Sequence, residues 1–316
     1  MIPLFGRVQC GPDSPMTQYK PMSQTDANPK TSRSLPGDIS QVVSLALAED
    51  IGSGDLTAAL VAADALAQVT VIAREAAVIC GHPWFDEVFR QLDPGIEIDW
   101  MMAEGEVSKA GQTICRLNGS ARSLLTGERT ALNFLQTLSA TATTAKTFAD
   151  AVSGTKCQIL DTRKTIPGLR SAQKYAVACG GAKNHRLGLF DAILIKENHI
   201  AATGSVAAAI VQARAISELP IQIEVENLEQ LDQALAANAD SILLDNFSNK
   251  LLTEAVNKTR ASGGKTRLEA SGGYQIEQLK DAAKTGVDFI SSGALTKNLR
   301  AIDFSMRFKL EESLDE

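Results

Sequence analysis

Residues 157–164 read CQILDTRK: the apolar run Cys157–Leu160 leads directly into Asp161, Thr162, Arg163 and Lys164. Apolar runs of this kind alternate with amphipathic helical patterns through the rest of the chain. Five more predicted strands are Ala192–Ile195, Ile221–Val225, Ser241–Leu244, Arg267–Ala270 and Asp288–Ile290. The predicted helices are Leu169–Cys179, Ser205–Ser217, Leu228–Ala236, Asn249–Ala261 and Gln275–Thr285. This alternation predicts an α/β fold made of βαβ units around a parallel sheet.

Six strands leave two arrangements open. They can close on themselves as a short relative of the eight-stranded barrel, or form an open doubly wound sheet. No Gly-x-Gly-x-x-Gly motif follows the first strand, which disfavours a dinucleotide-binding version of the open sheet.

The chain before this region divides into two parts. Residues 1–36 are rich in Pro, Ser, Thr, Gln and Asn, and we interpret them as a flexible extension. Asp38 can then cap a helix. Short strands are expected at Val69–Ile72, Ala77–Ile79, Ile96–Ile98 and Ile114–Leu117, with a helix over Trp84–Leu92 and a long helical region from Ser120. We therefore predict an α+β domain with connecting helices over 37–150, followed by the parallel α/β domain over 151–300.

Composition excludes several classes of protein. The net charge of −6 and isoelectric point near 5.3 argue against generic binding to nucleic acid or anionic membrane. No apolar run is long enough to cross a bilayer, and the first ten residues do not resemble a secretory signal. The five cysteines, Cys10, Cys80, Cys115, Cys157 and Cys179, include no Cys-x-x-Cys pair. This pattern predicts reduced thiols in a cytoplasmic protein, without a structural zinc site or disulfide framework.

Charge is distributed unevenly along the chain. Residues 161–199 hold seven Lys or Arg and only three acidic residues, together with two of the three histidines, His185 and His199. A cationic region inside an acidic protein predicts a small, multiply charged anion as ligand.

Every predicted strand ends in polar or small residues, which a barrel or a parallel sheet would bring to one edge. After the first strand, these ends are Lys196, Glu226, Asp245-Asn246, Ser271-Gly272-Gly273 and Ser292-Gly293. The two glycine-rich ends precede helical segments, and backbone N–H groups there favour phosphate. The two acids suit ribose hydroxyls or a Mg²⁺ ion bridged to phosphates.

Several of these residues also have simpler interpretations. Single loop cations are usually solvated, and His185 could be a surface histidine. Glu226 and Asp245 could cap helices. We expect His199 to be structural, whereas Lys196 could serve as a Schiff-base lysine.

The motifs together resemble one family. They are DTRKTIPGLR at 161–170, QKYAV at 173–177, GG at 180–181, NHRLGL at 184–189 and IKENH at 195–199, with EDIGSGDLT at 49–57, ERTALN at 128–133, EVE at 224–226, LDNF at 244–247 and GALT at 293–296. This set, extending over residues 38–308, is similar to quinolinate phosphoribosyltransferase, also called carboxylating nicotinate-nucleotide pyrophosphorylase. The run from 161 to 199 is the most specific part.

The resemblance implies a pentosyltransferase of de novo NAD biosynthesis. Such an enzyme combines quinolinate with phosphoribosyl pyrophosphate, in the presence of Mg²⁺, to give nicotinate mononucleotide, pyrophosphate and CO₂. It also implies an N-terminal α/β sandwich domain, an incomplete six- or seven-stranded α/β barrel, and a C-terminal segment (301–316) that returns to the first domain. The family forms homodimers with active sites at the interface.

The resemblance also assigns roles to residues. Quinolinate and pyrophosphate would contact Arg129 of the neighbouring subunit with Thr162, Arg163, Lys164, His185, Arg186 and Lys196. Glu226 and Asp245 would face the ribose and the metal, which is held mostly through phosphates and water. The 5′-phosphate would lie against Ser271, Gly272, Gly273, Ser292, Gly293 and Ala294. Lys164, Lys196, Glu226 and Asp245 are the expected catalytic residues.

Three alternatives remain at this stage. One is a paralogue of the same fold associated with molybdenum transport, which usually departs from the family at the positions of IKENH. Another is a Schiff-base aldolase that uses Lys196. The third is a non-catalytic sensor of a phosphate ligand.

Overall fold

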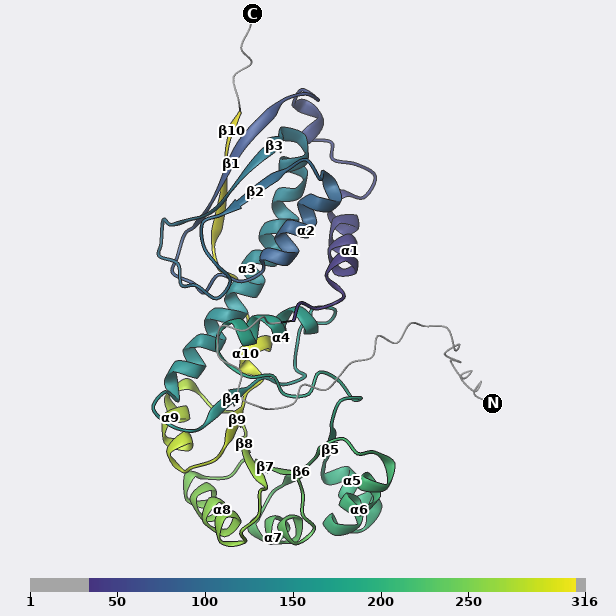
Figure 1. Ribbon diagram of the computed structural model, residues 1–316, viewed down its shortest axis with the longest axis vertical. Helices are drawn as coiled ribbons and strands as arrows, with labels where there is room; N and C mark the ends of the chain where they lie inside the picture. The colour runs from purple at the N-terminus through teal and green to yellow at the C-terminus, as the bar shows by residue number, and fades with distance from the viewer. Residues whose placement is uncertain (1–33, 311–316) are drawn as a thin grey trace, which may run out of the picture. The chain divides into compact units, whose positions relative to one another are not determined.

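The computed structural model describes residues 34–310 (Figure 1). Nearly all of the predicted N-terminal extension therefore lies outside the described residues. No helix within 34–310 is long and apolar enough to span a membrane.

The first domain is built on a four-stranded antiparallel sheet of order β10-β1-β3-β2. Its strands are β1 (Leu66–Ala73), β2 (Glu97–Trp100), β3 (Thr113–Ser120) and β10 (Phe304–Leu310). Alternate residues of β1 are buried, as expected of a strand with one face on a core. Figure 1 shows the helices α1 (Ile39–Ile51), α2 (His82–Leu92) and α3 (Ala121–Ala151) beside this sheet. A short 3₁₀ helix, η1, spans Ala58–Leu60.

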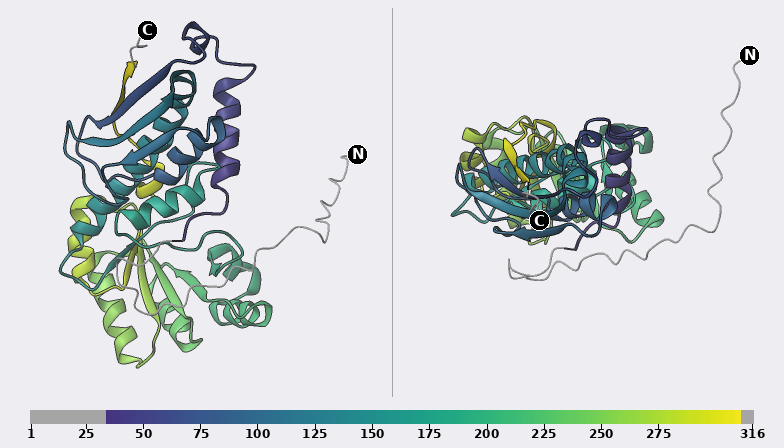
Figure 2. Two further views of the ribbon diagram at one scale, coloured as in Figure 1. Left: turned by 45° about the horizontal axis from the view of Figure 1, so that its top comes forward. Right: turned by 90° about the horizontal axis from the view of Figure 1, so that it is seen from above.

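The end of the described chain belongs to this first sheet. β10 runs antiparallel to β1, with Phe304 opposite Ala73 and Leu310 opposite Ala67. Figure 2 shows the yellow β10 alongside β1, although more than 200 residues separate them in sequence.

The prediction of a β-strand at Ala77–Ile79 is wrong. Val78 makes only an isolated bridge to Val107, and the segment bonds mainly to the loop at 105–108, where Ile79 N donates to the Glu106 carbonyl oxygen at 2.9 Å. Val78 N donates to Thr143 Oγ1 at 2.8 Å, and Cys80 N donates to Ser139 Oγ at 3.0 Å. The apolar run is buried, and hydroxyls of α3 add partners for two of its backbone N–H groups, so it does not extend into a regular strand.

The second domain is a six-stranded parallel sheet of order β4-β9-β8-β7-β6-β5. Its strands are β4 (Gln158–Leu160), β5 (Ile193–Ile195), β6 (Ile221–Val225), β7 (Ser241–Asp245), β8 (Arg267–Ser271) and β9 (Phe289–Ser291). The first strand pairs with the last, as in a closed barrel, but β4 and β5 do not pair within 34–310. Lys183 instead forms an isolated bridge with Leu160 at the β4 edge. The fold is therefore an incomplete six-stranded α/β barrel.

Helices follow the strands as predicted. They are α4 (Arg170–Cys179), α6 (Val206–Ile216), α7 (Leu228–Ala236), α8 (Asn249–Ala261) and α9 (Ile276–Lys284). Two short helices complete the domain: α10 (Ala294–Lys297) begins where a helical segment was expected after Ser292-Gly293, whereas α5 (Glu197–Thr203) was not predicted, because it is too short to show hydrophobic periodicity.

The long helix α3 connects the two domains and packs against α4. Gly180 follows α4 at the closest approach. A Cβ at this position would lie 2.2 Å from the Ala142 carbonyl oxygen, so a larger residue would separate the helices.

Candidate active site

The predicted site residues gather at the carboxyl end of the parallel sheet. Thr162–Lys164 follow β4, Lys196 follows β5 and Glu226 follows β6. Asp245 ends β7, Ser271 ends β8 and Ser292 follows β9. Parallel register therefore brings to one rim side chains that are up to 130 residues apart in sequence.

A polar cleft of about 320 Å³ opens at this rim. Eight of the predicted residues line it: Lys164, Asp245, Ser271, Gly272, Gly273, Ser292, Gly293 and Ala294. Asn246, which was identified with Asp245 at the end of its predicted strand, lines it too, whereas sequence reasoning missed Tyr274, Gln275, Lys297 and Asn298. Lys297 adds a second cation, from the short helix α10.

Lys164 and Gly293 pack directly on each other across this cleft. A Cβ on Gly293 would lie 2.9 Å from Lys164 Cδ and 3.4 Å from Thr162 Oγ1. The φ of Gly293 is −72°, so the requirement for glycine is steric and not conformational. Thr296 Oγ1 donates to the Lys164 carbonyl oxygen at 2.8 Å, which joins the loop after β4 to α10.

Arg163 and Arg186 lie close together, and the charge of Asp191 only partly offsets that of Arg186. Neither forms an ion pair within residues 34–310, and Arg163 Nε is buried without a hydrogen-bond partner there. Burial and the positive charge of Arg163 lower the pKa of Arg186. Two adjacent guanidinium groups with unused donors favour a bound anion.

Lys174, which the sequence counted among the cations of the ligand region, has a structural role. Its Nζ donates to Asp161 Oδ1 at 2.5 Å and to the His185 carbonyl oxygen at 2.9 Å, and both charged side chains are buried. Asp161 also accepts bonds from Asn184 Nδ2 at 2.7 Å and His185 N at 2.8 Å. Burial raises the pKa of Asp161, an effect that Lys174 and the two donors oppose. This pair fixes the loop that presents His185 and Arg186.

His185 belongs to a buried polar chain and is not a surface histidine. Arg186 N donates to its Nδ1 at 2.7 Å, a bond that requires the neutral Nε2–H tautomer. His185 Nε2 then lies 2.8 Å from Gln222 Oε1, and Gln222 Nε2 donates to Glu269 Oε2 at 2.8 Å. Gln222 and Glu269 were not predicted as site residues, because inside β6 and β8 they occur in otherwise apolar strands. The charged side chain of Glu269 in the middle of β8 was the one signal in the sequence that could have identified it as a site residue.

Glu269 controls the charge of His185. Burial alone would lower the pKa of His185, but the Glu269 carboxylate, 3.4 Å from Nε2, raises it. His185 and the other neighbours in turn lower the pKa of Glu269 against its own burial. The carboxylate therefore stays ionised while the imidazole titrates.

We expect Glu269→Gln to lower the pKa of His185, because removing the carboxylate leaves burial as the main influence. NMR titration of the three imidazoles should place the His185 transition above 6.5 in the parent protein and below 6.5 in the variant. A raised folded-state pKa contributes stability that is complete below pH 6.5 and disappears as the pH rises through that pKa. The variant should therefore lose more unfolding free energy at pH 5.5 than at pH 8.

The other two histidines serve as internal controls for this titration. His82 and His199 have no described contact with Glu269, so their transitions should not move. An unchanged His185 transition in the variant contradicts the assigned pairing.

Lys196 is paired, and His199 is structural as expected. Lys196 Nζ lies 2.5 Å from Glu224 Oε2, and about half of the lysine side chain is exposed. Lys196 N donates to His199 Nδ1 at 3.0 Å, so His199 caps the start of α5.

Glu226 and Asp245 sit at neighbouring strand ends with free carboxylate oxygens. Glu226 is exposed directly after β6, and Asp245 is half-buried at the end of β7, where Asn246 Nδ2 donates to its Oδ2 at 2.8 Å. Mg²⁺ is commonly held by one or two carboxylates together with substrate phosphates and water. This donor set is compatible with the predicted Mg²⁺ site.

Arg129 is not brought to this rim by its own chain. It is exposed on α3, in the part of that helix packed within the first domain, and it does not line the cleft. Its predicted role therefore depends on a second subunit.

Comparison with known proteins agrees with this geometry. The chain matches the models of the N-terminal domain of quinolinate phosphoribosyl transferase over residues 55–139 and of its C-terminal domain over 141–307. It is 44% identical to the carboxylating nicotinate-nucleotide pyrophosphorylase of Mycobacterium leprae over 268 residues, which is 83% of this chain and 94% of that protein. Identity to the chloroplastic enzyme of that name from Oryza sativa is 37% over 299 residues, covering 88% and 79% of the two chains.

A solved structure shows the same arrangement. The nicotinate-nucleotide pyrophosphorylase of Francisella tularensis superimposes with a TM-score of 0.84 at 46% identity, covering 87% of this chain and 98% of that one. Both domains of this chain thus match the same family in sequence and in fold. The chain belongs to the quinolinate phosphoribosyltransferase family.

Proposed function

We propose that this protein transfers the phosphoribosyl group of phosphoribosyl pyrophosphate to quinolinate, with decarboxylation, to give nicotinate mononucleotide, pyrophosphate and CO₂. The supporting observation is the rim itself: two adjacent arginines that form no ion pair within 34–310 stand beside a glycine-rich polar cleft of about 320 Å³. The arginines suit the two carboxylates of quinolinate, and the glycine-rich cleft suits the phosphate of the phosphoribosyl donor. The reaction belongs to the pentosyltransferases and supplies NAD biosynthesis.

The cationic side of the rim would hold quinolinate. Arg163 and Arg186 can each grip a carboxylate through two parallel N–H donors. His185 presents the edge of its ring next to Arg186, and Lys196 lies on the following strand end. Arg163, Arg186 and Lys196, with Thr162, supply donors for two carboxylates, while His185 shapes the site because both of its ring nitrogens are already hydrogen-bonded.

The cleft would hold the phosphoribosyl group. Ser271, Gly272 and Gly273 on one side, with Ser292, Gly293 and Ala294 on the other, offer hydroxyl and backbone donors to the 5′-phosphate. Glu226 and Asp245 lie where the ribose and the pyrophosphate would meet. Bound Mg²⁺ would supply neutralising charge to the pyrophosphate.

The transfer needs positioning and electrostatics, without a covalent intermediate on the protein. Positive charge develops on the ribose as pyrophosphate leaves, and Asp245 and Glu226 can stabilise it. Lys164, packed on Gly293, can stabilise the charge accumulating on pyrophosphate. Decarboxylation would follow transfer, because the new pyridinium nitrogen accepts the electrons that the departing carboxylate releases.

The direct test is product analysis. The full chain is incubated with quinolinate, phosphoribosyl pyrophosphate and Mg²⁺, and CO₂ and nicotinate mononucleotide are measured. Parallel reactions replace quinolinate with nicotinate or omit Mg²⁺. We expect product only in the complete mixture; turnover of nicotinate at the same rate would argue against recognition of the second carboxylate.

A Schiff-base aldolase is less well supported. Such a lysine must be a neutral amine to attack a carbonyl, whereas Lys196 is paired with Glu224. Borohydride trapping on Lys196 with a carbonyl substrate would favour the aldolase.

We also propose a homodimer in which Arg129 completes the neighbouring subunit's site. Mixing Arg129→Ala with Lys196→Ala should then restore activity, because a hybrid dimer contains one site with both residues intact. Random exchange makes half of the dimers hybrids with one working site each, so about a quarter of parental activity is expected. Activity of the mixture is measured after subunit exchange is verified by mass.

The matched control mixes Arg129→Ala with the double variant Arg129→Ala/Lys196→Ala, which offers no intact pair. Recovery in that mixture, or none in the first, contradicts a shared site.

We place the protein in the reducing cytoplasm. The described cysteines Cys80, Cys115 and Cys157 are buried and outside any disulfide, which agrees with that compartment.

A further inference from the structure

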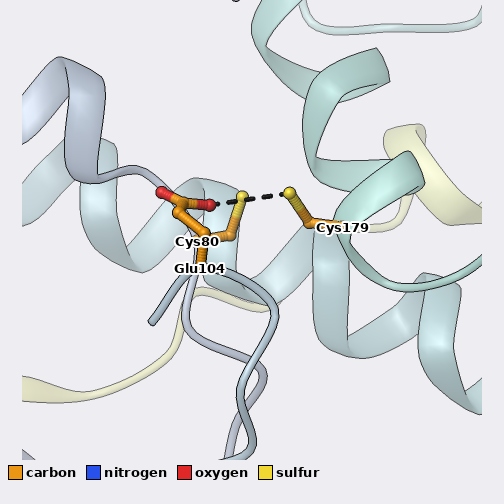
Figure 3. Close-up of side chains that lie close together, drawn as sticks. All are labelled: Cys80, Glu104 and Cys179. Atoms are coloured by element: carbon orange, nitrogen blue, oxygen red, sulfur yellow. Dashed lines mark hydrogen bonds between the residues drawn. The ribbon is translucent and has the colours of Figure 1, made fainter. Parts of the chain in front are cut away.

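A second cluster of chemically reactive side chains lies between the two domains, away from the rim (Figure 3). Cys80 precedes α2, Glu104 lies in the loop between β2 and β3, and Cys179 ends α4. Their two Sγ atoms and one carboxylate oxygen all lie within 4.8 Å of one another. The cysteines are 0% and 6% exposed, and Glu104 is half-buried.

The spacing of these atoms matches a tetrahedral metal centre. Cys179 Sγ lies 3.5 Å from Glu104 Oε2. With a zinc–sulfur bond of about 2.3 Å and a zinc–oxygen bond of about 2.0 Å, tetrahedral angles put sulfur and oxygen about 3.5 Å apart. This sulfur–oxygen pair therefore already has the spacing that a bound ion would need, and the Cys80 sulfur lies within 4.8 Å of both atoms.

The carboxylate is held in place by the backbone. Glu104 Oε1 accepts from Gly81 N at 2.8 Å and from His82 N at 2.6 Å, leaving Oε2 directed at the thiols. Gly81 has a φ of +122°, which only glycine adopts readily, and this conformation turns its N–H toward the acid. Such outer contacts orient metal ligands in known sites.

The same groups also form a satisfied network without a cation. Burial raises the pKa of Cys80, so its thiol stays protonated, and the Cys179 thiol donates to Glu104. A cation must therefore displace two thiol protons, and the experiment below distinguishes the two states.

We propose that Cys80, Glu104 and Cys179 bind a thiophilic divalent cation of the zinc type, with water in the fourth position. On binding, each thiol releases its proton to solvent, two sulfur–metal bonds and one oxygen–metal bond form, and no group changes oxidation state. Thiolates select such ions over Mg²⁺, so this site is separate from the magnesium chemistry of the rim. The ion would fasten the first domain to α4, the helix that begins at Arg170, just after the Arg163 loop.

The sequence predicted no structural zinc, because it contains no Cys-x-x-Cys pair. That reasoning covers only ligands that are close in sequence. Here the ligands come from three separate elements, so only the tertiary structure brings them together.

The test is a Co²⁺ titration of the full chain with its thiols kept reduced by a phosphine. We expect one equivalent of Co²⁺ to produce sulfur-to-metal charge-transfer absorption and the visible bands of a tetrahedral site. One equivalent of Zn²⁺ should remove them, and Mg²⁺ should not. Absence of these bands in the parent protein overturns the proposal, whatever the variants do.

Three variants locate the ion. Cys80→Ser and Cys179→Ser should each weaken Co²⁺ binding by more than ~100-fold, the upper range for loss of an outer-shell contact. Cys115→Ala is the matched control, since Cys115 is also fully buried in the first domain but outside the cluster, and it should bind Co²⁺ like the parent. Bands that persist in both cluster variants place the metal elsewhere and overturn the proposal.

Discussion

Replacing Arg163 with alanine should lower kcat/KM for quinolinate by about 10²–10³ while the protein remains folded. Its guanidinium lies at the rim beside Arg186, with a buried Nε that has no partner within 34–310. Removing it deletes a preorganised contact to an anion without opening a hydrophobic core. Relief of repulsion with Arg186 should leave the melting temperature unchanged or slightly higher.

Steady-state kinetics and thermal unfolding are measured on the same preparations. Arg163→Lys keeps the charge but loses the planar fork, so it should recover only part of the activity. Lys258→Ala removes a cation from an exposed pair with Asp232 on the barrel's outer helices and should leave kcat/KM unchanged. If Arg163→Ala turns over quinolinate at nearly the parental rate, Arg163 does not belong to the substrate-binding site.

Replacing Lys174 with methionine should cost about 3–5 kcal/mol of unfolding free energy, the usual penalty for removing one partner of a buried pair. Methionine matches the length of the side chain but leaves Asp161 charged and enclosed. It also deletes the bond to the His185 carbonyl oxygen, so the loop that presents His185 and Arg186 loses its anchor. Activity should fall along with stability.

Urea unfolding at pH 7 gives the free-energy change. Lys258→Met makes the same substitution at an exposed ion pair and should cost no more than about 1 kcal/mol. Asp161→Asn added to Lys174→Met should recover part of the loss, because it removes the uncompensated charge. Equal costs for the two methionine variants would contradict the buried pairing.

These experiments separate two cations that look alike in sequence. Arg163 and Lys174 both lie in the basic stretch after the first barrel strand, and the count of charges treats them equally. Folding buries Lys174 against Asp161, whereas Arg163 forms no ion pair with any acid in the described part of the chain. The difference depends on where α4 packs, which no local pattern encodes.

Much of the architecture follows from local patterns. Apolar runs and helical periodicity placed all six barrel strands and the five longer helices after them to within a residue or two, and the polar residue after each strand marked the rim. The short helix α5 was missed, and the segment at Ala77–Ile79 was misassigned as a strand. Their conformations depend on helix capping and on hydrogen bonds to a distant loop rather than on periodicity.

The sequence by itself determined the parallel α/β class, the family and the set of polar residues at the strand ends, because strand and helix periods are local properties of the chain. Only the tertiary structure decided which charges are paired, that Glu269 and Gln222 support His185 from inside the barrel, and that Cys80 and Cys179 meet beside Glu104. Each of these depends on distances between residues that are far apart in sequence. Such distances are set by the packing of whole elements, so they appear only once the two domains have folded against α3.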